Sequence, residues 1–327
     1  MNAGSCLLVG DIGGTHARFA LTAAGTPGFE HEQTFKCADF ADAQSAIAQY
    51  TGELNVSPTI MCLAVAGPII DGAVRFTNND WTIRDSQVSE HFGGIGVKLL
   101  NDFEAVAYSI PLIDPADLLR IGTPATNDLQ LPEYTVGIVG PGTGLGVAGL
   151  CKRRDQVFPI MGEGGHLGFA PASAGQTALF DCLEARFGRV SNERLLSGPG
   201  VENIYAALLT LSGGGDENLS APQIFERAAS GDTGLHTQAV SLFFEILGQV
   251  AGDVALLLGA RQGMYIAGGI VQRYPELVMK SNFRSAFENK GRHRSLMEMI
   301  PTSLITYPHP GLLGASYCAS EMALAGF

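Results

Sequence analysis

Hydrophobic positions along the chain follow two periodicities, which predict strands that alternate with helices. Continuous apolar runs of strand length lie at residues 7–10, 59–66, 97–100, 134–139 and 264–267. Apolar residues at helical spacing lie at residues 38–54, 103–108, across most of 176–262, and at 310–325. Such alternation favours an α/β fold with a largely parallel sheet.

A glycine turn joins two strand-like runs near the start of the chain, and the same arrangement recurs in its second half. The first turn is Gly13-Gly14-Thr15 and the second is Gly142-Thr143-Gly144. Glycine turns let backbone N–H groups approach a phosphate closely, although ordinary hairpins use glycine in the same way. The recurrence suggests a duplicated fold with one phosphate-binding turn in each half. Residues 110–132, rich in proline and weakly periodic, form the candidate domain boundary.

The run that follows each turn restricts the kind of nucleotide site. A dinucleotide-binding fingerprint needs a helix after its glycines, and a P-loop needs Gly-Lys followed by Ser or Thr. Here strand-like runs follow both turns, at 17–21 and 145–151, and no Gly-Lys-Ser/Thr sequence occurs. A Rossmann dehydrogenase and a Walker-type NTPase are therefore both disfavoured.

Two acidic residues follow predicted strands, at the positions where open α/β sheets bind ligands. Asp11 closes the first apolar run. A single carboxylate there suits Mg²⁺, which takes phosphate oxygens and waters as further ligands, but an ordinary turn also begins with Asp. Asp102 follows the run 97–100 and precedes a helix. It is either a ligand-facing carboxylate or the N-cap of that helix, and the two roles can coexist.

A second polar group is the segment Glu163-Gly164-Gly165-His166. Its two glycines predict an irregular loop that presents hydrogen-bond acceptors and donors to a small polar ligand. Glu193, farther along the chain, is a candidate partner. Taken alone, each of these side chains also fits a solvated surface position.

Composition narrows the classes of protein further. The chain has 327 residues, 46% of them hydrophobic and 16% charged, which is enough for a large core and about two domains. With 20 Lys and Arg against 32 Asp and Glu, the net charge is −12, which disfavours nucleic acid as a partner. The six cysteines are scattered without a CxxC pair, which predicts reduced thiols and no zinc site.

One apolar stretch, 240–260, has the length of a membrane span. It contains Glu245, Gln249 and Asp253, which would be costly in hydrocarbon, so we expect a buried helix or helix pair instead. Residues 1–5 carry no positively charged region ahead of an apolar run, so no secretory leader is expected. These features together predict a cytoplasmic protein without a membrane partner.

Five motifs then occur in the order found in bacterial glucokinases. They are Asp11-Ile12-Gly13-Gly14-Thr15-His16-Ala17-Arg18, Leu100-Asn101-Asp102-Phe103, Gly140-Pro141-Gly142-Thr143-Gly144-Leu145-Gly146, Glu163-Gly164-Gly165-His166 and Ala267-Gly268-Gly269-Ile270. Over essentially its whole length the chain resembles the ATP-dependent glucokinases of the enterobacterial type, which belong to the hexokinase and actin-like superfamily. One departure is His16, where that family more often has Asn. The related ROK sugar kinases carry a cysteine-rich zinc motif that this sequence lacks.

The resemblance implies a role for each motif. Asp102 would be the general base that takes the proton of the 6-hydroxyl of glucose as this hydroxyl attacks the γ-phosphate of ATP. The sugar hydroxyls would be held by Asn101, Asp102, Glu163, His166 and Glu193. Asp11 would also orient Mg²⁺. ATP would be bound by Gly10, Asp11, Ile12, Gly13, Gly14, Thr15, Gly142, Thr143 and Gly144, with Gly268 and Gly269 beneath the adenosine.

The resemblance also implies an architecture and a reaction. The expected fold is α/β, with two ribonuclease H-like (actin-like ATPase) domains flanking a cleft. The small domain would comprise 1–112 plus 308–327, with the C-terminal helix packed on it, and the large domain 113–307. The expected enzyme is a homodimer that converts glucose and ATP to glucose 6-phosphate and ADP, the first step of glycolysis, with Mg²⁺ and without zinc.

Two alternatives stay open beside this reading. One is another hexose kinase of the same fold that prefers mannose or fructose. The other is a sugar-binding regulator without catalytic activity, which would lack Asp102 or a phosphate-binding turn, or would add a DNA-binding segment. Asp102 and both turns are present, and no basic helix–turn–helix precedes Leu7.

Overall fold

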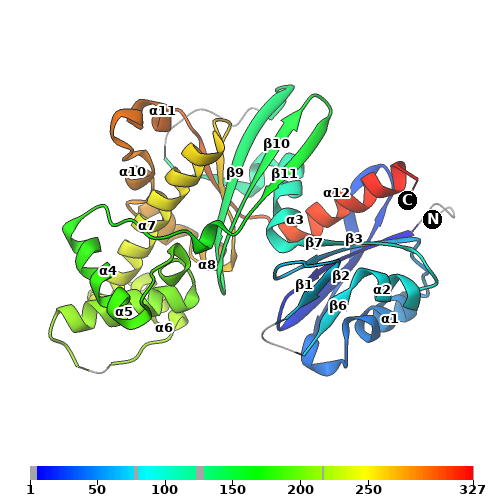
Figure 1. Cartoon of the computed structure of the whole chain (residues 1–327), viewed down its shortest axis with the longest axis horizontal. Coiled ribbons are helices and arrows are strands. Elements are labelled where there is room, and N and C mark those ends of the chain that lie inside the picture. Colours follow the sequence, from blue (N-terminus) through cyan, green and yellow to red (C-terminus); the bar gives the residue numbers. More distant parts are fainter. Residues whose placement is uncertain (1–5, 77–79, 123–128, 216, 327) are drawn as a thin grey trace. The chain divides into compact units, whose positions relative to one another are not determined.

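The computed structural model describes residues 6–76, 80–122, 129–215 and 217–326. The chain divides into two compact units (Figure 1). Unit 1 comprises Met1–Asp114 and Tyr307–Phe327, and unit 2 comprises Pro115–Thr306. The sequence analysis predicts the two domain boundaries at 112/113 and 307/308. The first of these lies within the predicted boundary stretch, residues 110–132. Each unit is a helix-covered sheet, which confirms the predicted α/β class. The expectation of a largely parallel sheet is wrong: both sheets are mixed, because the strands that follow the glycine turns pair antiparallel with the strands before them.

Unit 1 is built on a five-stranded sheet in the order β3-β2-β1-β4-β7. Strands β1, β2 and β3 are antiparallel neighbours, whereas β1, β4 and β7 run parallel. A small hairpin, β5–β6, stands apart from this sheet. The strands are β1 (Cys6–Ile12), β2 (His16–Ala23), β3 (Thr26–Lys36), β4 (Ile60–Val65), β5 (Ala73–Arg75), β6 (Thr82–Arg84) and β7 (Gly96–Asn101).

Helices cover both faces of this sheet, and the alternation along β1 assigns each face its helices. Leu8 and Ile12 pack into one core with α1, while Leu7 and Val9 pack into another with α3 and α12. Asp11 shares the parity of Leu7 and Val9, so its side chain points to the α12 side of the sheet. The helices are α1 (Ala43–Leu54), α2 (Asp85–His91), α3 (Asp102–Ser109) and α12 (Pro310–Leu324).

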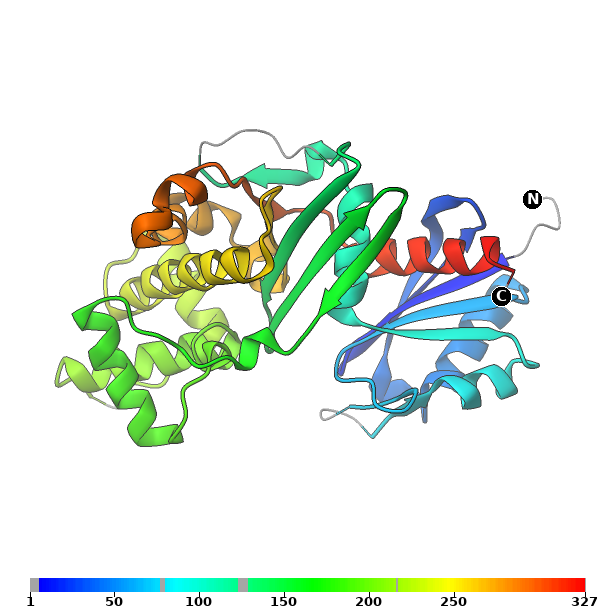
Figure 2. The same ribbon diagram turned by 45° about the horizontal axis from the view of Figure 1, so that its top comes forward.

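Two sequence-based expectations for unit 1 can be compared with these helices. The C-terminal helix does pack within unit 1, against α3 and β1 (Figure 2). The first helix, however, begins at Ala43 and not at 38. The reason is a capping box: the Asp42 side chain accepts the Ser45 N–H while the Ser45 hydroxyl reaches back to the Asp42 N–H. A short 3₁₀ turn, Cys37–Asp39, precedes it.

Unit 2 is built on a six-stranded sheet in the order β11-β10-β9-β12-β13-β8. Here too, three antiparallel strands (β11, β10, β9) lead into strands that run parallel to β9 (β12, β13), and β8 adds an antiparallel edge. The strand order of unit 1 therefore recurs, as the repeated glycine turns predict. The strands are β8 (Leu118–Arg120), β9 (Glu133–Pro141), β10 (Leu145–Arg153), β11 (Gln156–Met161), β12 (Met264–Ile266) and β13 (Thr302–Ile305).

The helices of unit 2 surround one long apolar helix, α7, which carries the predicted stretch 240–260 as a single helix. By length and composition α7 could cross a membrane, but 67% of its most apolar window is buried inside the protein. Phe243, Phe244 and Leu247 are fully buried in it, so α7 is a core helix. The helices are α4 (Ala174–Phe187), α5 (Gly198–Leu211), α6 (Ala221–Ala229), α7 (Leu235–Leu258), α8 (Gly269–Arg273), α9 (Pro275–Lys280), α10 (Phe283–Glu288) and α11 (Arg294–Glu298).

Candidate active site

In unit 1 the predicted residues gather at one edge of the sheet. Strands β1, β4 and β7 are parallel, with Ile12 beside Val65 and Val65 beside Asn101 in the register. Their carboxyl ends therefore meet at the same edge, where α/β sheets bind ligands. This edge carries Asp11 and the first glycine turn at one position and Asp102 at another.

Asp11 lies among charged groups and beside the start of α12. Its carboxylate is 27% exposed and is 3.8 Å from the Arg18 guanidinium, across the β1–β2 pairing. Burial raises the pKa of Asp11, and this effect outweighs the lowering by the nearby Arg18 guanidinium. A Cβ at Gly311 would lie 3.4 Å from this carboxylate, so the glycine leaves room beside it. His309, just ahead of α12, pairs with Glu32 at 3.1 Å.

The donor set at Asp11 fits magnesium in a phosphoryl-transfer site. Such sites use one or two carboxylates, and the nucleotide phosphates and waters complete the octahedron. In the part of the chain that the structure describes, no three His, Cys, Asp or Glu side chains come close enough to share a metal ion. A cation at Asp11 would therefore depend on phosphate oxygens for its remaining ligands.

The first glycine turn is pinned at both ends. Gly13 N–H donates to the His16 carbonyl at 2.9 Å, and the Thr15 carbonyl accepts the Cys37 N–H at 2.9 Å. The His16 side chain is exposed. Gly10 and Ile12 differ from the turn, because both lie in the core. A Cβ at Gly10 would meet Leu63 and Phe19, and the Ile12 side chain is fully buried. Only their backbone groups can therefore face a nucleotide.

Asp102 is the first residue of α3, and Asn101 is the N-cap. Asn101 Oδ1 accepts the N–H groups of Phe103 and Glu104, and its Nδ2 donates to the Gly67 carbonyl at 3.2 Å. The N-cap of α3, a role that the sequence analysis considered for Asp102, is therefore provided mainly by Asn101. Asp102 Oδ1 accepts the Phe103 N–H at 2.9 Å. Its carboxylate is thus placed at the strand end by a cap that another residue provides.

Glu104 completes this cap, and sequence reasoning did not find it. Its Oε2 accepts the backbone N–H of Asn101 at 3.3 Å, which closes a capping box around Asp102. Burial raises the pKa of Glu104, while the Asn101 N–H and Lys98 lower it, with a net rise. The signal that could have found it is the spacing Asn101-x-x-Glu104 at a strand–helix junction.

Glu104→Gln is expected to leave the protein at least as stable near neutral pH as the unsubstituted chain. Gln keeps an oxygen for the cap and removes a buried charge. Because the folded-state pKa is raised above 4.5, the stability contributed by Glu104 is present below that value and is lost as pH rises through the folded pKa. The gain of the Gln variant should therefore disappear below pH 4.5. Urea unfolding at both pH values measures this.

Glu104→Ala is the matched comparison. Ala removes the acceptor as well as the charge, so we expect a loss of about 1 kcal/mol near neutral pH, the usual cost of a missing helix cap. A Gln variant as unstable as the Ala variant would show that the charge of Glu104, not its capping oxygen, stabilises this junction.

In unit 2 the second glycine turn lies at the end of β9. Gly142 N–H donates to the Gly144 carbonyl at 2.8 Å, and the Gly142 carbonyl accepts the Gly198 N–H at 2.8 Å, from the start of α5. Gly268 joins this turn from the end of β12. It has a left-handed φ of 97°, and a Cβ there would lie 2.5 Å from the Pro141 carbonyl. Both reasons require glycine at 268, with Gly269 in open space beside it.

The segment Glu163–His166 forms the predicted irregular loop, with a 3₁₀ turn at Gly164–His166. Its glycines serve packing, since a Cβ at Gly165 would collide with the Leu145 carbonyl and one at Gly164 would meet Val147. The Glu163 and His166 side chains are exposed. The loop is therefore pressed onto β10, immediately after the second glycine turn, with its polar side chains free to face a ligand.

Glu193 links this loop to the turn. Its Oε2 accepts the Leu145 N–H at 2.9 Å, and its Oε1 is 4.0 Å from Nδ1 of His166. The carboxylate is 33% exposed, and His166 is 58% exposed. The structure therefore brings Glu193, His166 and the second turn together within unit 2, which the sequence could suggest only as a candidate partnership.

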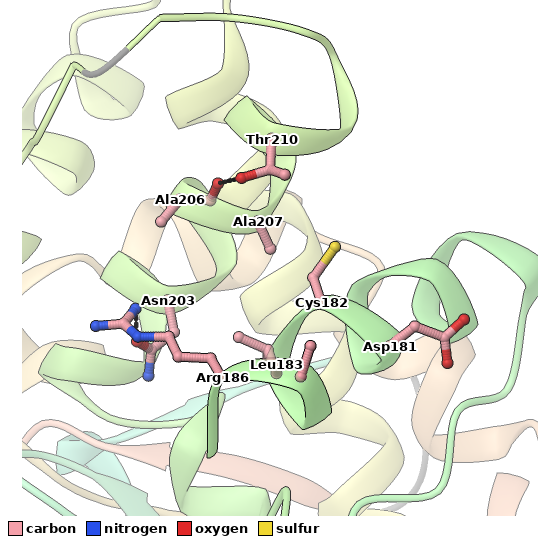
Figure 3. A pocket seen from close by; sticks show the side chains of 9 residues that line it. Asp181, Cys182, Leu183, Arg186, Asn203, Ala206, Ala207 and Thr210 are labelled. Carbon is pink, nitrogen blue, oxygen red and sulfur yellow. Dashed lines mark hydrogen bonds between the residues drawn. The ribbon is translucent and has the colours of Figure 1, made fainter. Parts of the chain in front are cut away.

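A hollow of about 560 Å³ on unit 2 contains none of the predicted site residues (Figure 3). It lies between α4 and α5, over a floor of small residues that includes Ala185, Ala206 and Ala207. Its one arginine, Arg186, donates to Asn203 Oδ1 at 3.1 Å. This guanidinium therefore holds α5 against α4.

Comparisons with known proteins agree over nearly the whole chain. A family model described as glucokinase matches residues 8–322. A glucokinase from Caulobacter vibrioides is 42% identical over 320 residues, covering 96% of this chain and 95% of that protein. The crystal structure of a glucokinase from an Antarctic psychrotroph matches with a TM-score of 0.86 at 33% identity, covering 97% of this chain and 99% of that one.

A fourth comparison extends the fold to a more distant protein. The crystal structure of the Balamuthia mandrillaris glucokinase in complex with glucose matches with a TM-score of 0.79 at 24% identity, over 96% of this chain and 93% of that one. The family model and the relatives thus define a sugar kinase. The chain belongs to the glucokinase family, since the family model and a 42% identical relative both span nearly all of it. It is an enzyme that phosphorylates glucose with ATP.

Proposed function

We propose that this enzyme transfers the γ-phosphoryl group of ATP to the 6-hydroxyl of glucose, with Asp102 as general base. One observation carries this assignment: Asp102 lies at the carboxyl end of β7, on the sheet edge that also carries Asp11 and the first glycine turn. A base and a phosphate-binding turn at one edge are the parts that in-line phosphoryl transfer needs.

The proposed chemistry at Asp102 is a proton transfer. The carboxylate accepts the proton of the 6-hydroxyl while the hydroxyl oxygen forms its bond to phosphorus and the bond to the ADP oxygen breaks. The Asn101–Glu104 capping box holds Asp102 at the strand end, so the base needs little reorganisation. Mg²⁺ at Asp11, when bound, would neutralise developing charge on the phosphate oxygens.

The proposed sugar-binding residues are Asn101, Asp102, Glu163, His166 and Glu193. Hydrogen bonds from hydroxyls to carboxylates are charge-assisted, so a sugar that leaves one of these acids unpaired is rejected strongly. The proposed nucleotide site uses the turns 13–15 and 142–144, the backbone of Gly10, Asp11 and Ile12, and Gly268-Gly269. Support for the last pair is the close approach of Gly268 to Gly140 and Pro141, which directly precede the second turn.

We further propose that the two units are ribonuclease H-like domains of an actin-like kinase, with a cleft for both substrates, and that the enzyme is a cytoplasmic homodimer. The strand order shared by the two sheets supports the first part of this proposal. The second part rests on the resemblance to enterobacterial-type glucokinases. Sedimentation of the full chain tests the dimer.

A substrate panel tests the proposed function. The assay couples ADP release to a colour change in the presence of ATP and Mg²⁺, with glucose, mannose, fructose and N-acetylglucosamine as acceptors. We expect glucose to give the highest kcat/KM. A preference for mannose or fructose would support the alternative of another hexose kinase of the same fold. Glucose binding without ADP release would support the alternative of a sugar-binding regulator without catalytic activity.

Glu163→Gln is expected to raise the KM for glucose roughly tenfold, because it weakens a charge-assisted bond to the sugar. The KM for ATP should change by less than about twofold, because Glu163 is proposed to contact the sugar and not the nucleotide. A tenfold change would correspond to about 1.4 kcal/mol. Steady-state kinetics with each substrate varied in turn measure both constants. Glu184→Gln, on exposed α4, makes the same charge change away from the loop and serves as control. A larger effect on ATP than on glucose would remove Glu163 from the sugar site.

A further inference from the structure

Three segments of unit 2 converge on one residue, Leu145, the first residue of β10. Its N–H donates to Glu193 Oε2 at 2.9 Å, and its carbonyl lies against Gly165, where any Cβ would collide with it. Leu145 also directly follows the glycine turn 142–144. The turn proposed for phosphate and the two segments proposed for sugar therefore meet at a single residue.

A second tether joins the turn to the segment that carries Glu193. The Gly142 carbonyl accepts the Gly198 N–H at 2.8 Å. Ser197 lies between Glu193 and Gly198 in the chain. Its hydroxyl donates to the Glu193 carbonyl at 2.9 Å and accepts the Gly200 N–H at 3.0 Å. Glu193 is thus held at its backbone by the start of α5 and at its carboxylate by the end of the turn.

Gly144 is the turn residue that makes this contact sterically feasible. A Cβ on Gly144 would lie 2.6 Å from Glu193 Oε2, closer than two such atoms can approach. The backbone of Gly144 is not in the left-handed region, so a side chain there is opposed by the Glu193 carboxylate, which would have to move, and not by φ. Gly52, within α1, offers a control: its φ is not left-handed either, and a Cβ there would meet nothing within 4 Å.

We propose that Gly144, which lies in the phosphate-binding turn, determines affinity for the sugar by leaving room for the Glu193 carboxylate. This inference rests on the proposed function, in which Glu193 accepts a sugar hydroxyl. One oxygen of Glu193 is used by the Leu145 N–H, and the other lies 4.0 Å from Nδ1 of His166, where it would accept the sugar hydroxyl. A side chain at 144 displaces the first oxygen and therefore moves the second away from the position that a neutral polyol requires.

The test measures glucose binding without nucleotide, so that a direct effect on ATP cannot enter. Isothermal titration calorimetry on the full chain compares the unsubstituted protein with Gly144→Ala and with the control Gly52→Ala, which lies outside the proposed site. We expect Gly144→Ala to raise the Kd for glucose about tenfold, the effect of losing a hydrogen bond to a charged group. The control should stay within about twofold, because its Cβ occupies open space.

A double-mutant cycle separates this mechanism from general damage to the turn. In the background Glu193→Ala no carboxylate remains to be displaced, so adding Gly144→Ala should change the Kd for glucose by less than about twofold. Thermal unfolding of each variant shows whether the fold is kept. If Gly144→Ala alone does not fold, the double variant is expected to fold, since the close contact is absent from it.

The outcomes distinguish this inference from the function on which it rests. If the unsubstituted chain does not bind glucose, the proposed function fails and the inference fails with it. If glucose binds but Gly144→Ala leaves its Kd within about twofold, the function stands and the inference is overturned. Equal effects of Gly144→Ala in both backgrounds, or a double variant that does not fold, would also overturn it.

Discussion

Asp102→Asn is expected to lower kcat by about 10²- to 10⁴-fold, the range that general-base catalysis contributes, while the enzyme still binds glucose. Asn has the same shape and keeps an oxygen for the Phe103 N–H, so the start of α3 is preserved. It cannot take the proton of the attacking hydroxyl. The loss should therefore fall on kcat, with the Kd for glucose changed by less than about tenfold, since a hydrogen-bonding oxygen remains.

The control for this substitution is Asp85→Asn. Asp85 is the first residue of α2 and accepts the N–H of the next residue, as Asp102 does in α3. The two substitutions thus make the same local change, and only one lies at the ligand-binding edge of the sheet. Turnover and glucose affinity are measured on the same preparations. Near-normal turnover of Asp102→Asn, or an equal loss in both variants, would remove Asp102 from the role of base.

Gly314→Ala is expected to destabilise the protein by about 1–3 kcal/mol, the usual cost of overpacking a core. Gly314 lies within α12, where α12 crosses α3, and a Cβ there would collide with the Ala105 carbonyl. The clash must outweigh the better helix propensity of Ala, which alone would stabilise the helix by about 1 kcal/mol. Because α3 begins at Asp102, we also expect kcat to fall.

Urea unfolding of Gly314→Ala and of a matched variant, Gly52→Ala, measures this effect. Gly52 lies in α1, and a Cβ there would meet nothing within 4 Å. The same substitution should therefore stabilise the protein by about 0.5–1 kcal/mol at that position. If both substitutions change the free energy of unfolding in the same direction, the close approach of α12 to α3 does not determine the effect of a side chain at position 314.

The periodic patterns predicted the core helix and most central strands, but not β13, whose four buried residues include the polar Thr302 and Ser303. Strands β1, β4, β9 and β12 are largely buried on both faces, so they appear as continuous apolar runs. The edge strands β3 and β11 escaped prediction because one side of each is solvated, and β11 even contains Pro159. An edge strand tolerates proline and polar residues since part of its hydrogen bonding is to water.

The candidate site could be predicted as a set of residues but not as a network. Motifs indicated Asp102, Glu163 and Glu193, since polar residues after strands and beside glycines are a local signal. The contact between Glu193 and Leu145, or between Gly311 and Asp11, joins residues far apart in the chain. Such contacts depend on tertiary packing, which a single sequence does not encode locally.

The role of glycines shows the same limit. The sequence analysis assigned the glycines of both turns to phosphate binding. The structure adds that Gly165 and Gly144 are required by Leu145 and Glu193, respectively, for reasons of space. A glycine that serves backbone conformation and one that serves close packing look identical in a sequence.

The position of the transferred phosphate tests the central claim most directly. The full chain is incubated with ATP, Mg²⁺ and glucose, and the products are followed by phosphorus and carbon NMR. The account predicts glucose 6-phosphate and ADP in equal amounts, with neither formed by Asp102→Asn at a comparable rate. Phosphate on another hydroxyl, or free phosphate released from ATP without a sugar phosphate, would contradict it.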